Sequence, residues 1–439
     1  MFENLFMPLK IGPVEIKNRI AMAPMNQQGD RDGHPTSQYT SFFNARALGG
    51  FGLLTTGSIL ACESASKEYP FVPYLYPGSF NMGYWYDFVE SVHSMGVDAK
   101  IFGQLSPGFG RQTGITGVRG ASPIPFKRHD LYQGLSKELR AWTRYFRNDW
   151  TNHLLGVPRE MNIDEIHRDE KYFVRSSELA ILAGFDGIEI HAPHGYLLHQ
   201  FLSPRSNQRK DEYGGSLRNR ARFLLELVSM CRENFGDAVP IVVRVSGREY
   251  QEGGLTAEDV RQICIWCEEA GADAISLSNG SGYDDMKHFM SSTPDNLELL
   301  EAQGKKLKEV IKIPVITVGL NSPEVAEKAI REGETDMVAL GRQAIADPEW
   351  PNKVKESRID EITKCTKDQF CVGMGINAGA VGMRCTQNPN YGKEQFMPEY
   401  QPRPMKGKVP ETLRRWKPGL RWEAGEEWQA YLKSLGKET

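Results

Sequence analysis

Residues 187–216 read GIEIHAPHGYLLHQFLSPRSNQRKDEYGGS, and this stretch predicts both a strand and the chemistry at its end. Its first residues alternate isoleucine with glutamate, as buried strands do, and the pattern stops at Pro193. Three polar side chains therefore fall at or just past the strand's end: His191, His194 and Tyr196. Two imidazoles can donate hydrogen bonds to a substrate oxygen and a phenol can give up a proton, so we interpret them as an oxyanion-binding pair and a general acid.

The histidine pair allows two other interpretations. A His-x-x-His pattern can be half of a metal site, but no third ligand follows at a recognisable spacing and the helical His-Glu-x-x-His context is missing. Either histidine taken alone could simply end a strand. The residues around the pair favour the catalytic interpretation.

Continuous apolar runs alternate with helical patterns along the whole chain. The runs lie at 18–25, 52–59, 99–105, 187–192, 240–246, 274–278, 314–319 and 337–341. Continuous apolar runs are typical of parallel strands that are covered on both faces. Eight strand–helix units predict an α/β fold of the (β/α)8 TIM-barrel type.

Helix starts support this order of elements. Capping-box spacing, or an N-cap followed by proline, occurs at Asn162 with Glu165, Thr256 with Asp259, and Ser322 with Pro323. A doubly wound sheet is the competing architecture. The glycine fingerprint that such a sheet carries after its first strand is missing, because Ala23-Pro24-Met25-Asn26 stands there.

In a barrel, the chemistry belongs at the carboxyl ends of the strands. The third strand ends at Gln104, and the fifth carries Arg244, whose guanidinium requires an anionic partner or several acceptors in such an apolar setting. The seventh ends at Gly319 and the eighth at Gly341 and Arg342. Glycines and a cation at these two ends predict a phosphate site, although a tight turn would explain any one glycine.

Taken whole, residues 187–223 closely resemble the signature region of the old yellow enzyme family of FMN-dependent oxidoreductases, and the barrel is similar to its 2,4-dienoyl-CoA reductase and 2-enoate reductase types. Beyond the histidines and the tyrosine, the matching residues are Ser203-Pro204, Asn207, Arg209, Asp211, Tyr213-Gly214-Gly215 and Asn219-Arg220. The resemblance implies that His191 and His194 bind the activating oxygen of the substrate over the flavin. It also implies that Tyr196 supplies a proton.

The resemblance further implies an FMN-binding barrel over residues 1–360. The positions that match the family's flavin contacts are Ala23, Pro24 and Met25 along the ring, Gln104 and Arg244 at its pyrimidine edge, and Gly319, Gly341 and Arg342 at the phosphate. A cation beside the pyrimidine edge stabilises the negative charge of the reduced ring.

Two departures from the family pattern concern the substrate pocket. After Met25, where many relatives have Cys or Thr and soon an aromatic residue, the chain has polar residues, of which Asn26 and Gln28 are candidates for the pocket wall. The connection after the third strand, 126–157, is long, and its aromatic residues, Trp142 and Tyr145 among them, recur at helical spacing. It is either an amphipathic helix packed on the barrel or a lid that favours an anionic or aromatic substrate.

A third departure lies after the barrel, in residues 361–395. Some relatives bind a [4Fe-4S] cluster there with four cysteines, whereas this chain keeps Cys365, Cys371 and Cys385 and has Asp368 where the second would be. A cluster normally needs four thiolates, so the segment is interpreted as degenerate and no cluster is expected. The seven cysteines of the chain fit reduced thiols better than a disulfide framework.

Residues 396–439 form a C-terminal tail with three tryptophans, Trp416, Trp422 and Trp428. The tail is either a disordered extension or a segment that docks on the chain's own barrel or on a neighbouring subunit of a homo-oligomer, and the large apolar rings favour docking. The larger relatives continue into a dinucleotide-binding half that reduces the flavin, and the tail is too short for it. We therefore expect free NADH or NADPH, or a separate electron donor, to reduce the flavin.

Composition excludes some classes of partner. With 53 basic and 56 acidic residues the net charge is −3, which gives no electrostatic case for nucleic acid or membrane binding. The N-terminus lacks the pattern of a signal peptide, and no apolar run reaches spanning length, so a cytoplasmic protein is expected.

These inferences predict an FMN-dependent ene-reductase. Hydride would pass from the flavin to the β-carbon of an enone, enoate or enoyl thioester, and Tyr196 would protonate the α-carbon. A flavin-dependent amine dehydrogenase or N-demethylase on the same fold and a flavoprotein electron-transfer subunit are the alternatives. The histidine pair favours an oxygen-activated acceptor, and a pure carrier needs neither the histidines nor the tyrosine.

Overall fold

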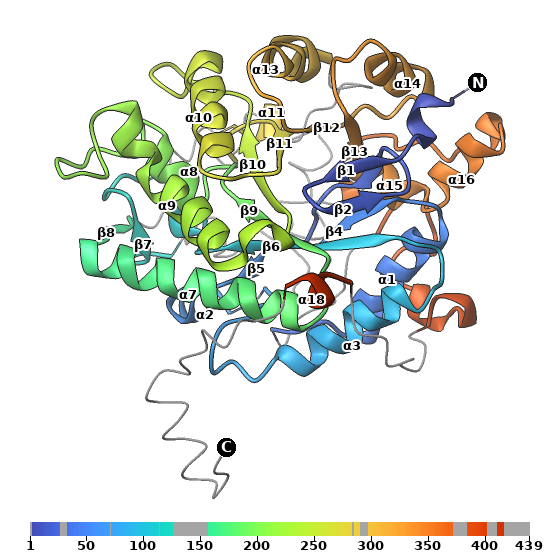
Figure 1. Ribbon diagram of the computed structural model, residues 1–439, viewed down its shortest axis with the longest axis horizontal. Coiled ribbons are helices and arrows are strands. Elements are labelled where there is room, and N and C mark those ends of the chain that lie inside the picture. The colour runs from blue at the N-terminus through green and yellow to red at the C-terminus, as the bar shows by residue number, and fades with distance from the viewer. Residues whose placement is uncertain are drawn as a thin grey trace, which may run out of the picture.

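Eight parallel strands close a barrel in the computed structural model (Figure 1). The structure describes residues 2–26, 33–70, 72–113, 115–125, 157–282, 285–289, 297–371, 384–401 and 411–416. The barrel strands are β3 (Ile20–Met22), β4 (Leu53–Thr55), β6 (Lys100–Ser106), β9 (Gly187–His191), β10 (Ile241–Ser246), β11 (Ala274–Ser278), β12 (Val315–Val318) and β13 (Met337–Leu340). Pairing of β13 with β3 and of β4 with β6 completes the ring. The predicted TIM barrel is confirmed, and each strand overlaps its predicted range.

An outer layer of helices follows the strands. Its main members are α1 (Ser37–Leu48), α3 (Met82–His93), α7 (Ile163–Leu182), α9 (Leu217–Phe235), α10 (Ala257–Glu269), α13 (Lys305–Lys308), α14 (Pro323–Arg331) and α16 (Trp350–Lys355). The predicted caps are confirmed. Asn162 and Glu165 form a capping box at α7, Thr256 and Asp259 form one at α10, and Ser322 caps α14.

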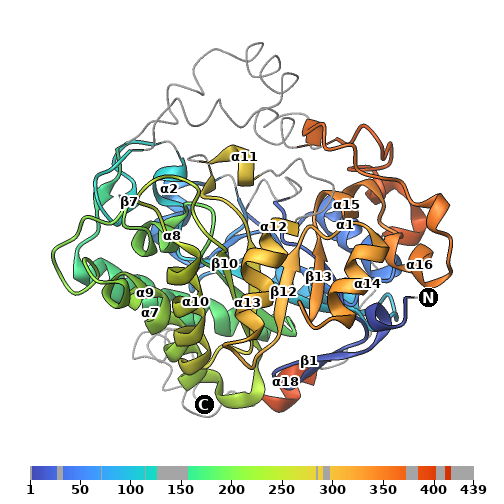
Figure 2. The ribbon, with the colours of Figure 1, turned by 90° about the horizontal axis from the view of Figure 1, so that it is seen from above.

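A hairpin made of β1 (Leu9–Ile11) and β2 (Val14–Ile16) closes one end of the barrel. Its three buried apolar side chains, Ile11, Val14 and Ile16, belong to the same cluster as the interior strand residues. Figure 2 shows this hairpin at one end of the molecule and α11 (Met286–Phe289) at the other. The polar residues predicted at the carboxyl ends of the strands therefore lie at the end away from the hairpin.

Short strands connect the two sides of the long insertion. β7 (Arg119–Gly120) pairs in parallel with β8 (Arg159–Glu160). This pairing brings the start and the end of the predicted lid together. Residues 126–156, with Trp142 and Tyr145, lie outside the described residues, so the lid stays a prediction.

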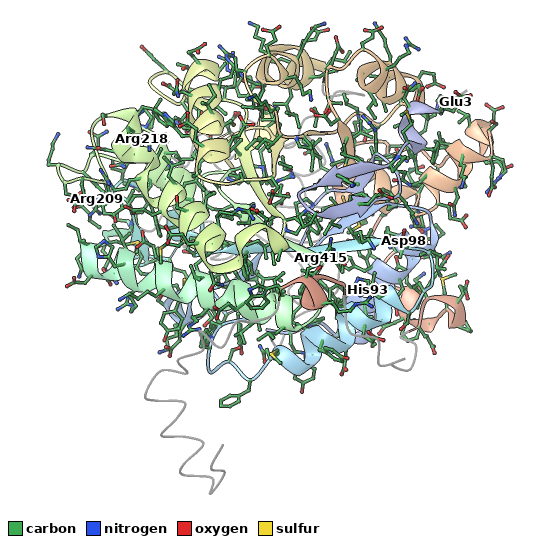
Figure 3. The ribbon with its side chains drawn as sticks, in the orientation of Figure 1. Glu3, His93, Asp98, Arg209, Arg218 and Arg415 are labelled. Carbon is green, nitrogen blue, oxygen red and sulfur yellow. The ribbon has the colours of Figure 1, made fainter. Side chains whose placement is uncertain are left out.

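The tail docks on its own barrel at the end that carries the hairpin. In α18 (Glu411–Arg415), Thr412 Oγ1 donates to the Asp186 carbonyl at 3.2 Å, and Arg415 Nη1 donates to the Pro13 carbonyl at 2.5 Å. The Trp416 ring packs edge-on against Phe235, with centroids 5.1 Å apart. Figure 3 labels Arg415 near His93, whose ring bonds the Asp186 carboxylate. Docking is confirmed for Trp416, whereas Trp422 and Trp428 lie outside the described residues.

Two further observations concern disulfide bonds and membrane-spanning helices. None of the seven cysteines is paired in a disulfide. Across the part of the chain that the structure describes, no helix combines the length and the apolar character that a membrane crossing requires.

Candidate active site

The structure brings the three predicted catalytic residues together at the carboxyl end of β9. His191 is the last residue of the strand, and Tyr196 immediately precedes α8 (Leu197–Leu202). Ring centroids lie 5.5 Å apart for His191 and His194, 5.0 Å for His191 and Tyr196, and 6.3 Å for His194 and Tyr196. One small ligand can therefore touch all three rings.

The turn between β9 and α8 holds His194 in an unusual backbone conformation. His194 and Gly195 follow one another with φ of +65° and +72°, which lie in the left-handed region. A Cβ on Gly195 would lie 2.4 Å from Gln112 Nε2 and 2.6 Å from the Ser281 carbonyl oxygen, so only glycine fits there. The His194 backbone N–H donates to Ser246 Oγ at 3.2 Å, which helps to hold a conformation that a non-glycine residue rarely adopts.

Both histidines are neutral at physiological pH. Burial, followed by the charge of Arg244, lowers the pKa of His191 well below its ordinary value. Burial also lowers the pKa of His194, with His191 as the next cause. Neutral imidazoles can each donate one hydrogen bond and accept another, as the binding of a carbonyl oxygen requires.

Tyr196 keeps its proton. Its ring is partly buried and packs on Phe109, with centroids 4.7 Å apart. Burial, and then the neighbouring Tyr69, raise the pKa of Tyr196 above its ordinary value. The phenol is therefore a proton donor and not a base at physiological pH.

A chain of polar side chains crosses the inside of the barrel below these rings. Gln104 Nε2 donates to Glu189 Oε1 at 2.6 Å. Arg244 donates through Nη1 to Ser276 Oγ at 2.9 Å and through Nη2 to Ser278 Oγ at 3.2 Å. Strand register explains the set, because Gln104 pairs with Glu189 and Arg244 pairs with Ser276 on adjacent strands. The two predicted flavin contacts, Gln104 and Arg244, thus belong to one network.

Glu189 and Arg244 stabilise each other's charge. Burial raises the pKa of Glu189, and the nearby Arg244 opposes that rise. Burial lowers the pKa of Arg244, and Glu189 acts in the opposite direction. A guanidinium stays protonated in proteins, so the barrel interior contains a buried cation.

Sequence reasoning missed Glu189, Ser276 and Ser278 as site residues. A charged residue between two isoleucines in a buried strand was a usable signal for Glu189, because Arg244 required an anionic partner. The two serines gave no such signal. Small hydroxyl residues occur in many buried strands, and only barrel closure places these beside Arg244.

The ends of β3 and β13 meet near the predicted flavin ring contacts. A Cβ on Gly341 would lie 3.8 Å from Met25 Sδ and 3.9 Å from Ala23 Cβ. Gly319, at the end of β12, has a φ of +88°, but its N–H donates to the Ala339 carbonyl. Convergence is therefore observed for Ala23, Met25 and Gly341, while phosphate binding by Gly319, Gly341 and Arg342 stays a prediction.

Comparison with known proteins decides the family. A model of the NADH:flavin oxidoreductase / NADH oxidase family matches residues 4–361. The chain belongs to this family. It is 38% identical over 414 residues to an NADH oxidase of Thermoanaerobacter brockii, and this alignment covers 93% of this chain and 59% of the relative. It is 34% identical over 422 residues to a cinnamate reductase of Clostridium sporogenes, and this alignment covers 90% of this chain and 59% of the relative.

A solved structure is also similar. The complex of 2-naphthoyl-CoA reductase with 2-naphthoyl-CoA superposes with a TM-score of 0.75 at 27% identity, over 90% of this chain and 58% of that chain. The chain spans about three-fifths of the length of these relatives. The family and the barrel are thus shown for the part that is shared.

The site of this NADH:flavin oxidoreductase family member fits a flavin. Arg244 Nε and both ring nitrogens of His191 are buried without a hydrogen-bond partner in the described part of the chain. Buried polar atoms are almost always bonded, so these atoms indicate a ligand that completes the site. Gln104 and Arg244 would hold the polar edge of FMN, where the arginine offers a positive charge to the reduced ring.

Asn26, another predicted pocket residue, lies where β3 meets the turn after β4. Asn26 Oδ1 accepts from the Ser58 N–H at 2.8 Å, and a Cβ on Gly57 would lie 2.4 Å from the same oxygen. Asn26 therefore ties the end of β3 to the turn after β4, and its part in the substrate pocket stays a prediction. Gln28 lies outside the described residues.

The cysteine segment folds around a carboxylate. Asp368 accepts from Thr366 Oγ1 at 2.8 Å, from the Phe370 N–H at 2.9 Å and from Thr386 Oγ1. Among the described residues, no group of three or more His, Cys, Asp or Glu is placed to hold a metal ion. Residues 372–383 lie outside the description, so the status of Cys365, Cys371 and Cys385 as cluster ligands stays untested.

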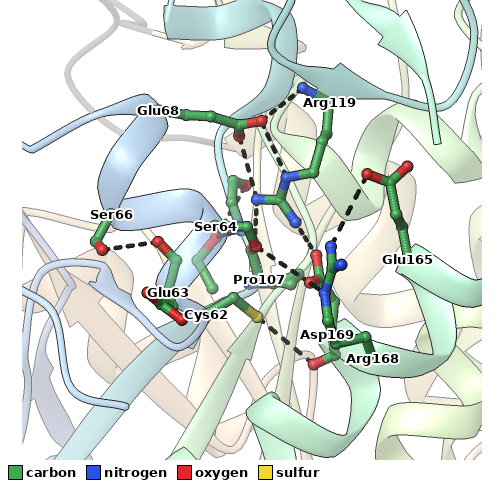
Figure 4. Close-up of polar contacts among 12 residues, drawn as sticks. Cys62, Glu63, Ser64, Ser66, Glu68, Pro107, Arg119, Glu165, Arg168 and Asp169 are labelled. Atoms are coloured by element: carbon green, nitrogen blue, oxygen red, sulfur yellow. Dashed lines mark hydrogen bonds and ion pairs between the residues drawn. The ribbon is translucent and has the colours of Figure 1, made fainter. Parts of the chain in front are cut away.

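A second buried network supports the loop behind Tyr196 (Figure 4). The Arg119 side chain bonds Glu68 through Nε at 3.0 Å and Nη2 at 3.1 Å, and ion-pairs with Asp169. Arg119 Nη2 also donates to the Pro107 carbonyl at 3.4 Å. Two residues further on, Phe109 contacts Tyr196. Sequence reasoning missed this network, because its members are far apart in the chain.

Proposed function

We propose that this chain uses bound FMN to reduce an activated carbon–carbon double bond in an enone, enoate or enoyl thioester. One observation carries the proposal: His191, whose two ring nitrogens are buried and have no partner among the described residues, lies beside His194 and a protonated Tyr196. Two neutral imidazoles and a phenol are what an oxygen-activated acceptor needs. The names of the cinnamate reductase and 2-naphthoyl-CoA reductase relatives support this class of substrate.

Each residue has a defined part in the proposed reaction. FMN, when bound, supplies the hydride. His191 and His194 orient the activating oxygen and donate to it as negative charge develops there. Tyr196 holds the proton that the α-carbon receives. Arg244 and Gln104 fix the polar edge of the cofactor, so that the double bond and the phenol meet in one geometry.

We propose NADH or NADPH as the reductant, in keeping with the name of the family. A separate electron donor is the alternative source. If the predicted lid covers the site, its basic stretch, residues 127–150, would favour an anionic substrate, and this part of the proposal rests on the sequence alone.

Anaerobic visible spectroscopy tests the proposal. The purified protein should show a flavin spectrum that bleaches with NADH or NADPH and recovers when a simple enone is added. A flavin that bleaches with an amine and ignores the enone would contradict it in favour of amine oxidation. Failure to bind FMN, even on reconstitution, would remove the cofactor and with it the proposal.

A further inference from the structure

We propose that Ser278 fixes the His194 ring as the tautomer that carries its proton on Nδ1. The Ser278 side chain, at the end of β11, lies between a cation and this imidazole. Its Oγ is 3.2 Å from Arg244 Nη2 and 2.6 Å from His194 Nε2. Ser278 is a positioning residue, because it acts on the reaction only through His194.

Donor and acceptor roles follow from the chemistry of the three groups. A guanidinium can only donate, so the Ser278 oxygen accepts from Arg244. The hydroxyl hydrogen then requires an acceptor, because Ser278 is buried. Within the described residues, His194 Nε2 is the acceptor found at hydrogen-bonding distance. Nε2 is therefore unprotonated, and the single proton of a neutral imidazole resides on Nδ1.

The surroundings of His194 disfavour the doubly protonated ring. Burial, His191 and Arg244 all lower its pKa. On a further side the ring packs against Phe289, with centroids 4.7 Å apart, where a charge would be poorly solvated. The His194 ring therefore carries a single proton, and the hydrogen bond from the Ser278 hydroxyl determines which ring nitrogen holds it.

Two neighbouring serines divide the work of holding His194. Ser246 and Ser278 are partners in the register of β10 and β11. Ser246 Oγ accepts from the His194 backbone N–H and donates to the Gly280 carbonyl at 2.5 Å, so it fixes the main chain. Ser278 fixes the ring. His191 has no such partner among the described residues, so its tautomer is left to the ligand.

The arrangement has a consequence for substrate binding that rests on the proposed function. With Nε2 occupied, Nδ1–H is the donor that His194 offers to the substrate oxygen. Arg244 polarises the Ser278 hydroxyl, which strengthens its bond to Nε2 and makes the N–H on the far side of the ring a stronger donor. One hydroxyl thus links the arginine at the cofactor to the histidine at the substrate.

Nitrogen NMR tests the tautomer directly. Full-length protein purified with its flavin would be labelled with ¹⁵N-histidine, and two-bond ¹H–¹⁵N correlations at neutral pH would distinguish Nδ1–H from Nε2–H. A His194→Gln variant serves only to assign the signal. We expect Nδ1–H in the wild type. An Nε2–H or doubly protonated His194 would overturn the proposal without any variant.

Variants at the two serines that bond Arg244 provide matched tests. Ser278→Ala should lose the Nδ1–H preference, whereas Ser276→Ala removes the other serine on Arg244 and should keep it. Ser278→Thr retains a hydroxyl and should also keep it. An unchanged tautomer in Ser278→Ala would overturn the proposal. If that variant does not fold, the wild type and Ser278→Thr still decide, since both must show Nδ1–H.

Kinetics test the functional consequence separately. Ser278→Ala should raise the KM for an enone by about 3- to 10-fold, the usual effect of losing one oriented hydrogen bond, with a smaller change in kcat. Ser278→Thr should restore KM. If the protein reduces no enone, the proposed function fails while the tautomer can still be read. If it does, an unchanged KM contradicts the role of Ser278 in substrate binding.

Discussion

Tyr196 shows how a single residue obtains its chemistry from packing. Its ring lies against Phe109 and beside His191, and burial raises the pKa of its phenol. A raised pKa keeps the proton in place until a carbanion-like carbon develops next to it.

Replacing Tyr196 with Phe should separate the two half-reactions. The variant should still bind FMN and be reduced by NADH or NADPH, but its reoxidation by an enone should slow by about 10²- to 10⁴-fold, the usual contribution of a positioned acid. Stopped-flow spectroscopy of each half-reaction measures this. Tyr172→Phe is the control, since the Tyr172 hydroxyl bonds Glu63 and not the histidines. Normal reoxidation in the Tyr196 variant would remove this residue from the mechanism.

Single residues were predictable where their chemistry stood out from their surroundings. The histidines, the tyrosine and Arg244 are polar groups in or next to apolar strands, and the structure gathers all four. Ser278 was not predictable. Its role depends on β11 lying beside β10, and this neighbourhood exists only after the strands have paired.

Between elements, a carboxyl pair links α7 and α9. Glu170 on α7 is buried, and burial, followed by a hydrogen bond and charge repulsion from Glu226 on α9, raises its pKa from 4.5 to about 8. Tyr213 donates to Glu226 Oε2 at 2.9 Å. Because the folded state binds this proton more tightly than the unfolded chain does, the stabilisation is complete below about pH 4.5 and is lost as the pH rises through about 8.

Glu170→Gln should therefore flatten the dependence of stability on pH. The wild type should lose thermal stability relative to the variant between about pH 6 and about pH 9, because Gln has no proton to lose. Calorimetry at the two pH values measures the difference. Glu178→Gln changes another α7 glutamate, one that pairs with Arg175, and should not flatten the profile. Parallel profiles for wild type and Glu170→Gln would contradict the shared proton.

Arg119 on β7 provides a second test at the scale of elements. Arg119→Ala removes the cation that Glu68 shares with the fully buried Asp169 and leaves Asp169 with the half-exposed Arg168, 3.9 Å away, as its cation, so it should lower the free energy of unfolding by about 3–5 kcal/mol. Arg159→Ala on the adjacent β8 breaks a pair with Glu165 in which the arginine is half exposed, and should cost about 1 kcal/mol or less. Denaturant titrations measure both. Equal losses of unfolding free energy would show that the buried Arg119 network stabilises the fold no more than the half-exposed Arg159 pair does.

Elements were predictable where the signal was local. Apolar runs predicted the barrel strands, and short-range patterns predicted the caps at Asn162, Thr256 and Ser322. The hairpin of β1 and β2 and the pairing of β7 with β8 were not predicted. Both pairs form small sheets apart from the barrel, and strands of two or three residues have no periodicity to detect.

At the scale of the whole molecule, the sequence predicted that the tail docks but not where on the barrel it docks. Three tryptophans predicted docking, and Trp416 does dock, at the end of the barrel opposite the active site. Trp416→Ala should lower the free energy of unfolding by about 3 kcal/mol, the usual cost of emptying a buried aromatic position. It should leave the flavin spectrum unchanged. A stability equal to that of the wild type would mean that the tail does not hold the barrel.

Pairing of β3 with β13 closes the barrel, and this closure affects how the chain folds during its synthesis. Val338 pairs with Ile20 and Leu340 with Met22, so the first barrel strand lacks one of its two neighbours until the last barrel strand has formed. During synthesis, β3 has an open edge until residues 337–340 leave the ribosome, and open strand edges invite pairing with other chains. Aggregation of nascent chains, and the need for chaperones that shield this edge, should therefore end abruptly once the eighth strand has emerged.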